Sequence, residues 1–488
     1  MARDGRSGRK VAEAVAAFLE GSGRSVVVAA CALALAGCAS LSDDGGFSDV
    51  ASVVKSRTGK DAAWARSDAE RAATDARVAE LLGRRPLGVE AAVQVAILGN
   101  RGLQAAFAGL GLAEADLVQA GRLPNPHFSL LRAKLGEDYK IEQALTFNVL
   151  SLVTAPLATE IERRRFEQAK RDAAMEAIRL AAETRKAWVA AVAAEETVRY
   201  MGRVREAADA GAELARRMEE AGNWSRLARA REQGFYAQAA LDAARAEQVR
   251  IATRERLTRL MGLWGDQAGF ALPERLPDLP AQPEERPDVE RLAMQRRLDV
   301  RSAVLDTEAL ARNLGLTKAT RLVNVLELGP ARVLEGAKSD PYKKGYEISL
   351  ELPLFDGGGA RVAKAEATYR QALERTAQAA VDARSEVREA YRSYRLNYDI
   401  ARHFREEIVP LRKRISEENQ LRYNGMLIGV FDLLADARSQ VLSVTGYVDA
   451  LRAFWIAQAD LELAMDGPAG PSTGPRTAVP QTETAVGH

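Results

Sequence analysis

Segments in which apolar and polar residues alternate are typical of β-strands that bury one face. The clearest covers residues 346–355, and its apolar positions on one face are Tyr346, Ile348, Leu350, Leu352 and Leu354. Three further extended segments are expected at about residues 127–133, 145–153 and 322–329. About ten residues is the length that a tilted membrane-spanning strand needs, but half-buried strands of ordinary sheets show the same alternation.

Long stretches of helical pattern surround these segments, and one order of elements occurs twice along the chain. Each half is expected to begin with a helix, to continue with two extended segments joined by a polar loop, and to end with a very long helix broken once near a glycine. The helices are predicted over residues 89–121, 155–263, 288–317 and 360–465. Gly222 lies as far beyond Ala155 as Gly425 lies beyond Gly358, so two hairpins of matched length are expected.

Local signals predict where the long helices begin and reverse. Thr154 is expected to cap the first of them, with Pro156 in its first turn. Gly222 and Gly425 are expected at the two reversals, because glycine adopts backbone angles that are closed to other residues. Trp224 lies beside the first reversal and is a candidate docking residue, although packing against the neighbouring hairpin is equally compatible with its position.

Composition and these patterns divide the chain into six parts. A stretch rich in proline separates the two repeats, and a tail rich in Pro, Gly, Thr and Ser is expected to be disordered. The predicted parts are a signal peptide (1–37), an N-terminal segment (38–85), a first repeat (86–271), a Pro-rich linker (272–287), a second repeat (288–466) and the tail (467–488).

The N-terminus has the layout of a secretory signal. An uncharged apolar run, residues 26–36, follows Arg24, and it is too short to span a bilayer. It ends in Leu-Ala-Gly-Cys at residues 35–38, which resembles the lipobox of bacterial lipoproteins. That resemblance implies cleavage before Cys38, acylation of Cys38 and, with Ala39 following, sorting to the outer membrane. The alternative is a buried helix with a chance cysteine. Cys31 would leave with the signal, so no disulfide within the mature chain is expected.

Charge and composition favour a helical protein that does not bind nucleic acid. The chain has 488 residues, of which 6% are aromatic, and it is rich in Ala, Arg, Glu and Leu. Its formal net charge of +2 arises within the first 37 residues, so the remainder is about neutral. The arginine clusters at 163–165 and 226–231 have acidic residues interleaved on the same helices, so solvated or salt-bridged faces are expected.

The sequence contains no pattern of catalytic or cofactor-binding residues. The three histidines, His127, His403 and His488, are scattered without partners at the spacing of metal ligands. The glycines at 357–359 are not followed by the lysine of a phosphate-binding loop, so they predict a sharp turn. We therefore expect no catalytic site, no metal site and no cofactor.

Five sequence strings, in this order, resemble the TolC-type outer membrane factor family over nearly all of the chain up to residue 467. They are residues 96–104 (AILGNRGLQ), 121–126 (GRLPNP), 286–289 (RPDV), 352–358 (LPLFDGG) and the pair 423–425 (YNG) with 430–434 (VFDLL). The chain departs from the family at 319–321, where a proline is usual, and at Ala435, where a second acidic residue is common and Asp436 follows instead.

The resemblance implies a mainly α fold with a small β part. In that fold two repeats form long helical hairpins and four membrane-spanning strands, and three subunits close a barrel of twelve strands that continues into a periplasmic helical barrel. An oligomer is also required physically, because an open sheet edge in lipid leaves backbone groups unsatisfied. The implied function is a passive outer membrane channel of a tripartite efflux system, with a periplasmic adaptor and an inner membrane pump as partners.

The same resemblance places Gly222, Trp224 and Gly425 at the periplasmic end of the channel. Asp432 and Asp436 lie four residues apart on one helix face near that end, and in a trimer they would form carboxylate rings that favour cations. The alternative is that both face water outside. The rival function is a lipid-anchored periplasmic coiled-coil scaffold or adaptor without a pore. Drugs, metal ions and polypeptides are all compatible with the sequence as exported substrates.

Overall fold

The computed structural model describes residues 40–322, 325–351, 355 and 357–468. The chain forms two compact units, each built from segments that are distant in sequence. Within the described residues, the sheet unit comprises residues 40–46, Gly109–Ala169 and Val304–Arg375, and the helical unit comprises Phe47–Ala108, Lys170–Ala303 and residues 376–468.

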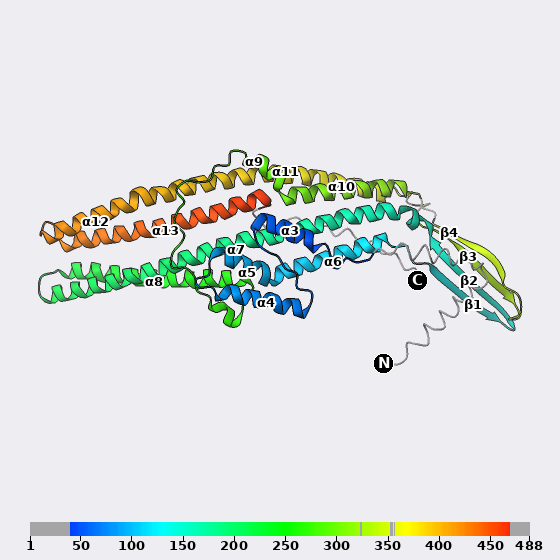
Figure 1. Ribbon diagram of the computed structural model, residues 1–488, viewed down its shortest axis with the longest axis horizontal. Coiled ribbons are helices and arrows are strands. Elements are labelled where there is room, and N and C mark those ends of the chain that lie inside the picture. Colours follow the sequence, from blue (N-terminus) through cyan, green and yellow to red (C-terminus); the bar gives the residue numbers. More distant parts are fainter. Residues whose placement is uncertain (1–39, 323–324, 352–354, 356, 469–488) are drawn as a thin grey trace. The chain divides into compact units, whose positions relative to one another are not determined.

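Four antiparallel strands form one sheet in the order β1-β2-β3-β4 (Figure 1). The strands are β1 (His127–Leu135), β2 (Asp138–Asn148), β3 (Leu326–Gly336) and β4 (Lys343–Leu350). β1 and β2 are joined by the two residues Gly136 and Glu137, and Gly136 has a φ of +63°, as the tight hairpin requires. The two hairpin turns therefore lie at the same end of the sheet.

Two of the four strand predictions were displaced along the chain. The second strand was expected over 145–153, but it covers 138–148, and residues from Val149 onward are helical. The third was expected over 322–329, but it covers 326–336. In both cases the predicted polar loop is instead a paired strand, because its residues hydrogen-bond to neighbours on either side. The fourth strand covers 343–350, so it begins three residues before the predicted segment.

The long helices follow the predicted hairpin pattern. The first pair consists of α7 (Val149–Glu220) and α8 (Arg226–Met261), and α8 folds back along α7 (Figure 1). The second consists of α11 (Gly359–His403), the π-turn η2 (Phe404–Ile408), α12 (Val409–Asn424) and α13 (Val430–Asp466).

The predicted cap of the first long helix was wrong. Asn148 performs this role, because its Oδ1 accepts the backbone N–H of Ser151 at 2.8 Å. The hydroxyl of Thr154 donates to the carbonyl of Leu150 at 2.9 Å within the helix. Pro156 consequently lies inside α7, in its second turn.

The leading helix of each repeat is divided in two by a single residue. Asn100 separates α5 (Val89–Gly99) from α6 (Arg101–Gly121), and Arg297 separates α9 (Val289–Arg296) from α10 (Leu298–Ala319). The sequence predicted the outer bounds of the first pair but neither break. Before them, the N-terminal segment contains α3 (Phe47–Thr58) and α4 (Asp68–Gly83), and Ser67 caps α4.

The Pro-rich linker has no helix or strand, yet it is held by side chains of the helical unit. The indole of Trp455 donates to the carbonyl of Pro277 at 3.0 Å, and the hydroxyl of Tyr398 donates to the carbonyl of Ala281 at 2.7 Å. Leu276 and Leu279 of the linker are buried. The linker is therefore packed against the helices and fixed there by hydrogen bonds.

Candidate functional site: the sheet faces and the hairpin turns

The sheet register places the predicted residues of β4 on one face together with apolar residues of the other strands. Residues directly opposite each other in a sheet point to the same side. Ile348 is opposite Leu328, which is opposite Phe147, and Leu350 is opposite Leu326. We call this side the apolar face, and its apolar members include Phe128, Leu130, Leu145, Phe147, Leu326, Leu328, Pro330, Tyr346, Ile348 and Leu350.

The apolar face is open within the single chain. Tyr346 is 77% exposed, Ile348 58% and Leu350 47%, so nothing in the described chain covers them. A contiguous exposed apolar surface of this kind marks contact with lipid or with another protein. Leu352 and Leu354, which were predicted to continue this face, lie outside the described residues.

The opposite side of the sheet carries acidic and polar residues, and we call it the carboxylate face. Its acidic members are Asp138, Glu142, Glu327, Glu335 and Glu347. The hydroxyl of Thr146 donates to Glu327 at 3.2 Å across β2 and β3, and Lys140 pairs with Glu142 at 2.8 Å. The strand carboxylates thus lie on one face and most of the large apolar strand residues on the other, the alternation expected of a strand between lipid and water.

The first hairpin reverses at Gly222, as the sequence predicted. Gly222 has a φ of +77°, its N–H donates to the carbonyl of Glu219, and the next residue, Asn223, donates to Met218. This is the glycine-terminated helix end that requires a left-handed residue. Ser225 then caps α8 by accepting the N–H of Ala228 at 3.1 Å. Trp224 is only partly exposed at this turn.

The second hairpin reverses one residue later than predicted. Gly425 has a φ of −81°, an ordinary value, and the left-handed residue is Met426, with a φ of 60°. Met426 donates to Tyr423, and Leu427 donates to Arg422, which repeats the hydrogen bonds at Gly222. Met426 and Leu427 are 93% and 77% exposed, so this turn presents more apolar surface than the turn at Trp224. Sequence reasoning missed these two residues, although both are large apolar residues at a predicted turn.

The two aspartates beyond this turn differ in their surroundings. Asp432 is exposed, and its carboxylate accepts the N–H of Gly429 at 3.3 Å, which caps α13. Asp436 is 8% exposed, and its Oδ2 has no hydrogen-bond partner among the described residues. The helix side that carries both aspartates is therefore exposed at Asp432 and buried at Asp436.

Among the residues that the structure describes, none of the helices has an apolar run long enough to cross a bilayer. In the same part of the chain, no cluster of three or more His, Cys, Asp or Glu could hold a metal ion. Cys38 lies outside the described residues.

Solved structures of outer membrane channels match most of the chain. CmeC of Campylobacter jejuni has a TM-score of 0.65 at 16% identity, covering 77% of this chain and 85% of that channel. VceC of Vibrio cholerae has a TM-score of 0.64 at 16% identity, covering 82% and 97%. The open state of MtrE from Neisseria gonorrhoeae has a TM-score of 0.64 at 18% identity, covering 80% and 89%. No protein-family model and no curated protein matches the sequence.

This chain has the TolC-type fold. The repeated helical hairpins and the four-stranded sheet that the sequence strings implied are thereby confirmed.

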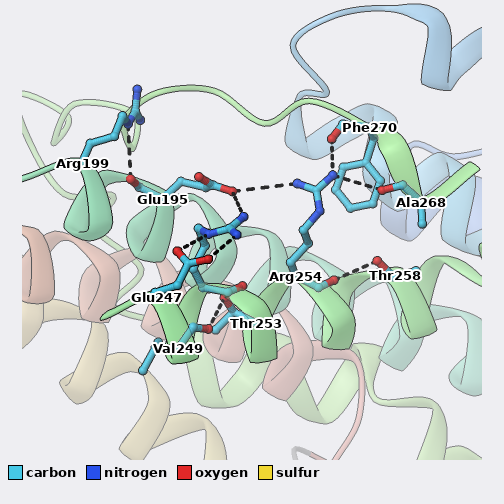
Figure 2. Close-up of polar contacts among 10 residues, drawn as sticks. Glu195, Arg199, Glu247, Val249, Thr253, Arg254, Thr258, Ala268 and Phe270 are labelled. Carbon is cyan, nitrogen blue, oxygen red and sulfur yellow. Dashed lines mark hydrogen bonds and ion pairs between the residues drawn. The ribbon is translucent and has the colours of Figure 1, made fainter. Parts of the chain in front are cut away.

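A half-buried polar cluster within this TolC-type chain links its long helices to the loop that precedes the linker (Figure 2). Glu195 of α7 accepts from Arg250 of α8 at 3.3 Å and lies 3.9 Å from Arg254. Arg254 also donates to the carbonyls of Ala268, at 3.0 Å, and Phe270, and its guanidinium lies 4.3 Å from the ring of Phe270. These charged residues of α7 and α8 hold the loop after α8 in place.

Proposed function

We propose that the chain is one subunit of a trimeric outer membrane channel that serves as a passive conduit for efflux. The observation that carries this proposal is the sheet, which has one exposed apolar face and one carboxylate face in a chain with the TolC-type fold. A periplasmic scaffold without a pore would leave that apolar face in water, where its exposure is unfavourable.

The strand order supports a trimer. β1 and β4 are the outer strands of the sheet, so each has an edge without a partner in the chain. An unpaired edge in hydrocarbon is costly, and four strands are too few to close a barrel. Three copies, with β4 of one next to β1 of the next, would leave no free edge.

The test compares two substitutions at neighbouring positions of β4. Leu350 lies on the apolar face and Ser349 on the carboxylate face. Leu350→Arg puts a charge on the apolar face, so it should cost up to about 2–4 kcal/mol, the value for a charge at mid-membrane, and reduce the yield of trimer. Ser349→Arg, the matched control, should leave the trimer intact and alter the current in planar bilayers. A wild-type protein without trimer or current would favour the scaffold, and equal effects of both substitutions on assembly would contradict the assignment of faces.

Acylation of Cys38 is part of the proposal, supported by the lipobox-like string at 35–38. Two or more acyl chains would give stable membrane attachment. Mass spectrometry of the mature N-terminus should find an acylated Cys38. An unmodified cysteine, or a start elsewhere, would remove the anchor from the proposal without affecting the channel.

The turns at Gly222 and Met426 are proposed to form the periplasmic end that meets an adaptor and an inner membrane pump. The exposed Met426 and Leu427 supply apolar contact area for such a partner. Asp432, exposed beside them, is proposed to line the aperture. Asp432→Ala should change conductance or cation preference in planar bilayers, and an unchanged current and preference would place this carboxylate outside the pore.

A further inference from the structure

Charge on the sheet is sorted by face. Among the strand residues that the structure describes, the apolar face carries no acidic residue, whereas the carboxylate face carries five. The cations of the apolar face are Arg132, Lys134, Arg332 and Lys344, and we call them the basic belt.

The basic belt lies at one end of the sheet. Lys134 is next to the β1–β2 turn, opposite Tyr139, and Arg132 is opposite Ile141. Lys344 is directly opposite Arg332, close to the β3–β4 turn. The large apolar residues of this face lie mainly toward the other strand ends, where Leu326 is opposite Leu350. Along each hairpin an apolar stretch is therefore followed by cations as the turn is approached.

Aromatic rings accompany the cations. The guanidinium of Arg132 and the ammonium of Lys134 lie 5.7 Å and 5.2 Å from the ring of Tyr139. The guanidinium of Arg332 lies 4.9 Å from the ring of Tyr342 and donates to Gln143 at 2.6 Å. Tyrosines mark the headgroup level in membrane proteins, because the ring is apolar and the hydroxyl is polar.

The carboxylate face at the same end also carries cations. Its two lysines are paired with carboxylates of their own face, Lys140 with Glu142 at 2.8 Å and Lys343 with Glu335 at 3.4 Å. The cations of the basic belt are gathered where no strand carboxylate shares their face.

We propose that the basic belt binds the phosphate groups of an anionic phosphoglycolipid in the membrane leaflet at the hairpin end of the sheet. This inference rests on the proposed function, because it needs the apolar face to lie in lipid. Phosphate is recognised by Arg and Lys through charge-assisted hydrogen bonds. Along one face an apolar surface gives way to cations and tyrosines at the hairpin end. This matches the change with depth from acyl chains to the interface and its headgroups, which favours a lipid over free phosphate.

The experiment measures binding of bisphosphorylated lipid A and of its dephosphorylated form to the purified full-length trimer, by native mass spectrometry. The test variant is Lys134→Gln with Lys344→Gln. The matched control is Lys140→Gln with Lys343→Gln, which removes the same charge from the same strand ends on the other face. Wild type should prefer the phosphorylated lipid, and the test variant should lose about tenfold or more in affinity for it, since each surface cation contributes severalfold. The control should retain that affinity.

Equal losses in both variants, or no preference of wild type for the phosphorylated lipid, would overturn the proposal. Displacement of the lipid by inorganic phosphate at equal concentration would also overturn it, because the site would then recognise free phosphate. The same preparations are tested for current in planar bilayers. Normal current without the lipid preference removes this inference alone, and the lipid preference without current removes the proposed channel function alone.

Discussion

The two repeats of this chain build the same helix break from different side chains. In the first, the amide of Asn100 donates to the carbonyl of Leu260 at 2.9 Å, and its Oδ1 caps α6 by accepting from Leu103. In the second, Arg297 donates to the carbonyl of Ala464 at 3.3 Å. Leu260 lies as far beyond Gly222 as Ala464 lies beyond Met426, so the two acceptors are equivalent positions.

The difference lies in what each side chain needs in order to be buried. The neutral amide of Asn100 is satisfied by hydrogen bonds alone. Arg297 is 1% exposed, so its charge requires carboxylates, and Asp299 and Glu386 both lie 2.8 Å from its guanidinium. Burial by itself lowers the pKa of Arg297. The hydrogen bonds to the two carboxylates raise it by more, so the pKa is above its usual value. One backbone geometry can thus be held by an isolated amide or by an ionic cluster, with different consequences for mutation.

The largest expected effect distinguishes these two breaks. Arg297→Met leaves Asp299 and Glu386 without their cation and should cost about 3–5 kcal/mol. Asn100→Ala removes a cap and one hydrogen bond and should cost about 1–2 kcal/mol. Thermal unfolding of the purified protein, followed by circular dichroism, measures both. Equal losses would mean that the ionic cluster is not what holds the second break, and adding Glu386→Gln to Arg297→Met should recover part of the loss.

The second comparison concerns the two reversals. Gly222→Ala places a side chain at a φ of +77° and should cost about 1–2 kcal/mol. Met426→Gly removes the strain of a side chain in the same left-handed conformation in the second repeat. It should therefore increase the free energy of unfolding by up to about 1 kcal/mol, which appears as a higher melting temperature. Gly425→Ala is the control and should have little effect, because Gly425 has an ordinary φ. Destabilisation by Met426→Gly would show that contacts of Met426 outweigh its backbone strain.

The third comparison concerns the caps of the returning helices. The first repeat uses the side chain of Ser225 to accept the N–H of Ala228, whereas the second uses Asp432 to accept the N–H of Gly429. Ser225→Ala and Asp432→Ala should each cost about 1 kcal/mol or less. Asp432→Asn retains an acceptor and should preserve more stability than Asp432→Ala. An equal loss of stability in Asp432→Asn and Asp432→Ala would indicate that the charge of Asp432, and not its hydrogen bond, is required.

The smallest expected effect is a pH dependence at a position where only the second repeat has a titratable residue. Asp466 is the counterpart of Gly262, and burial raises its pKa despite Arg296 at 3.2 Å and Arg57 at 3.3 Å. The folded state therefore binds this proton more tightly than the unfolded chain. Its stabilising effect is present below the unfolded pKa of about 3.9 and is lost as pH rises through the raised pKa. Asp466→Asn should flatten this part of the stability profile. An unchanged profile in thermal unfolding between about pH 4 and 7 would contradict the assignment.

Local patterns in the sequence were sufficient for several parts of the fold. Alternation at Tyr346, Ile348 and Leu350 predicted a strand with these residues on one face, and their shared face is observed. The reversal at Gly222 was predicted because glycine tolerates the left-handed region. The extent of β2 was missed, although Tyr139 and Ile141 alternate with charged residues in the sequence. Alternation through charged positions was interpreted as a loop, when it was a signal for a strand with one wet face.

By itself, the sequence determined the repeated order of elements, the strand faces and the first reversal, because each depends on residues that are close in the chain. The tertiary structure alone decided which residues of different strands share a face, and hence that Lys134 and Lys344 belong to one basic belt. It also decided that Met426 takes the left-handed position and that Arg297 is buried between Asp299 and Glu386. Register and charge burial depend on partners far away in sequence, and a periodic pattern contains no information about which partner is chosen.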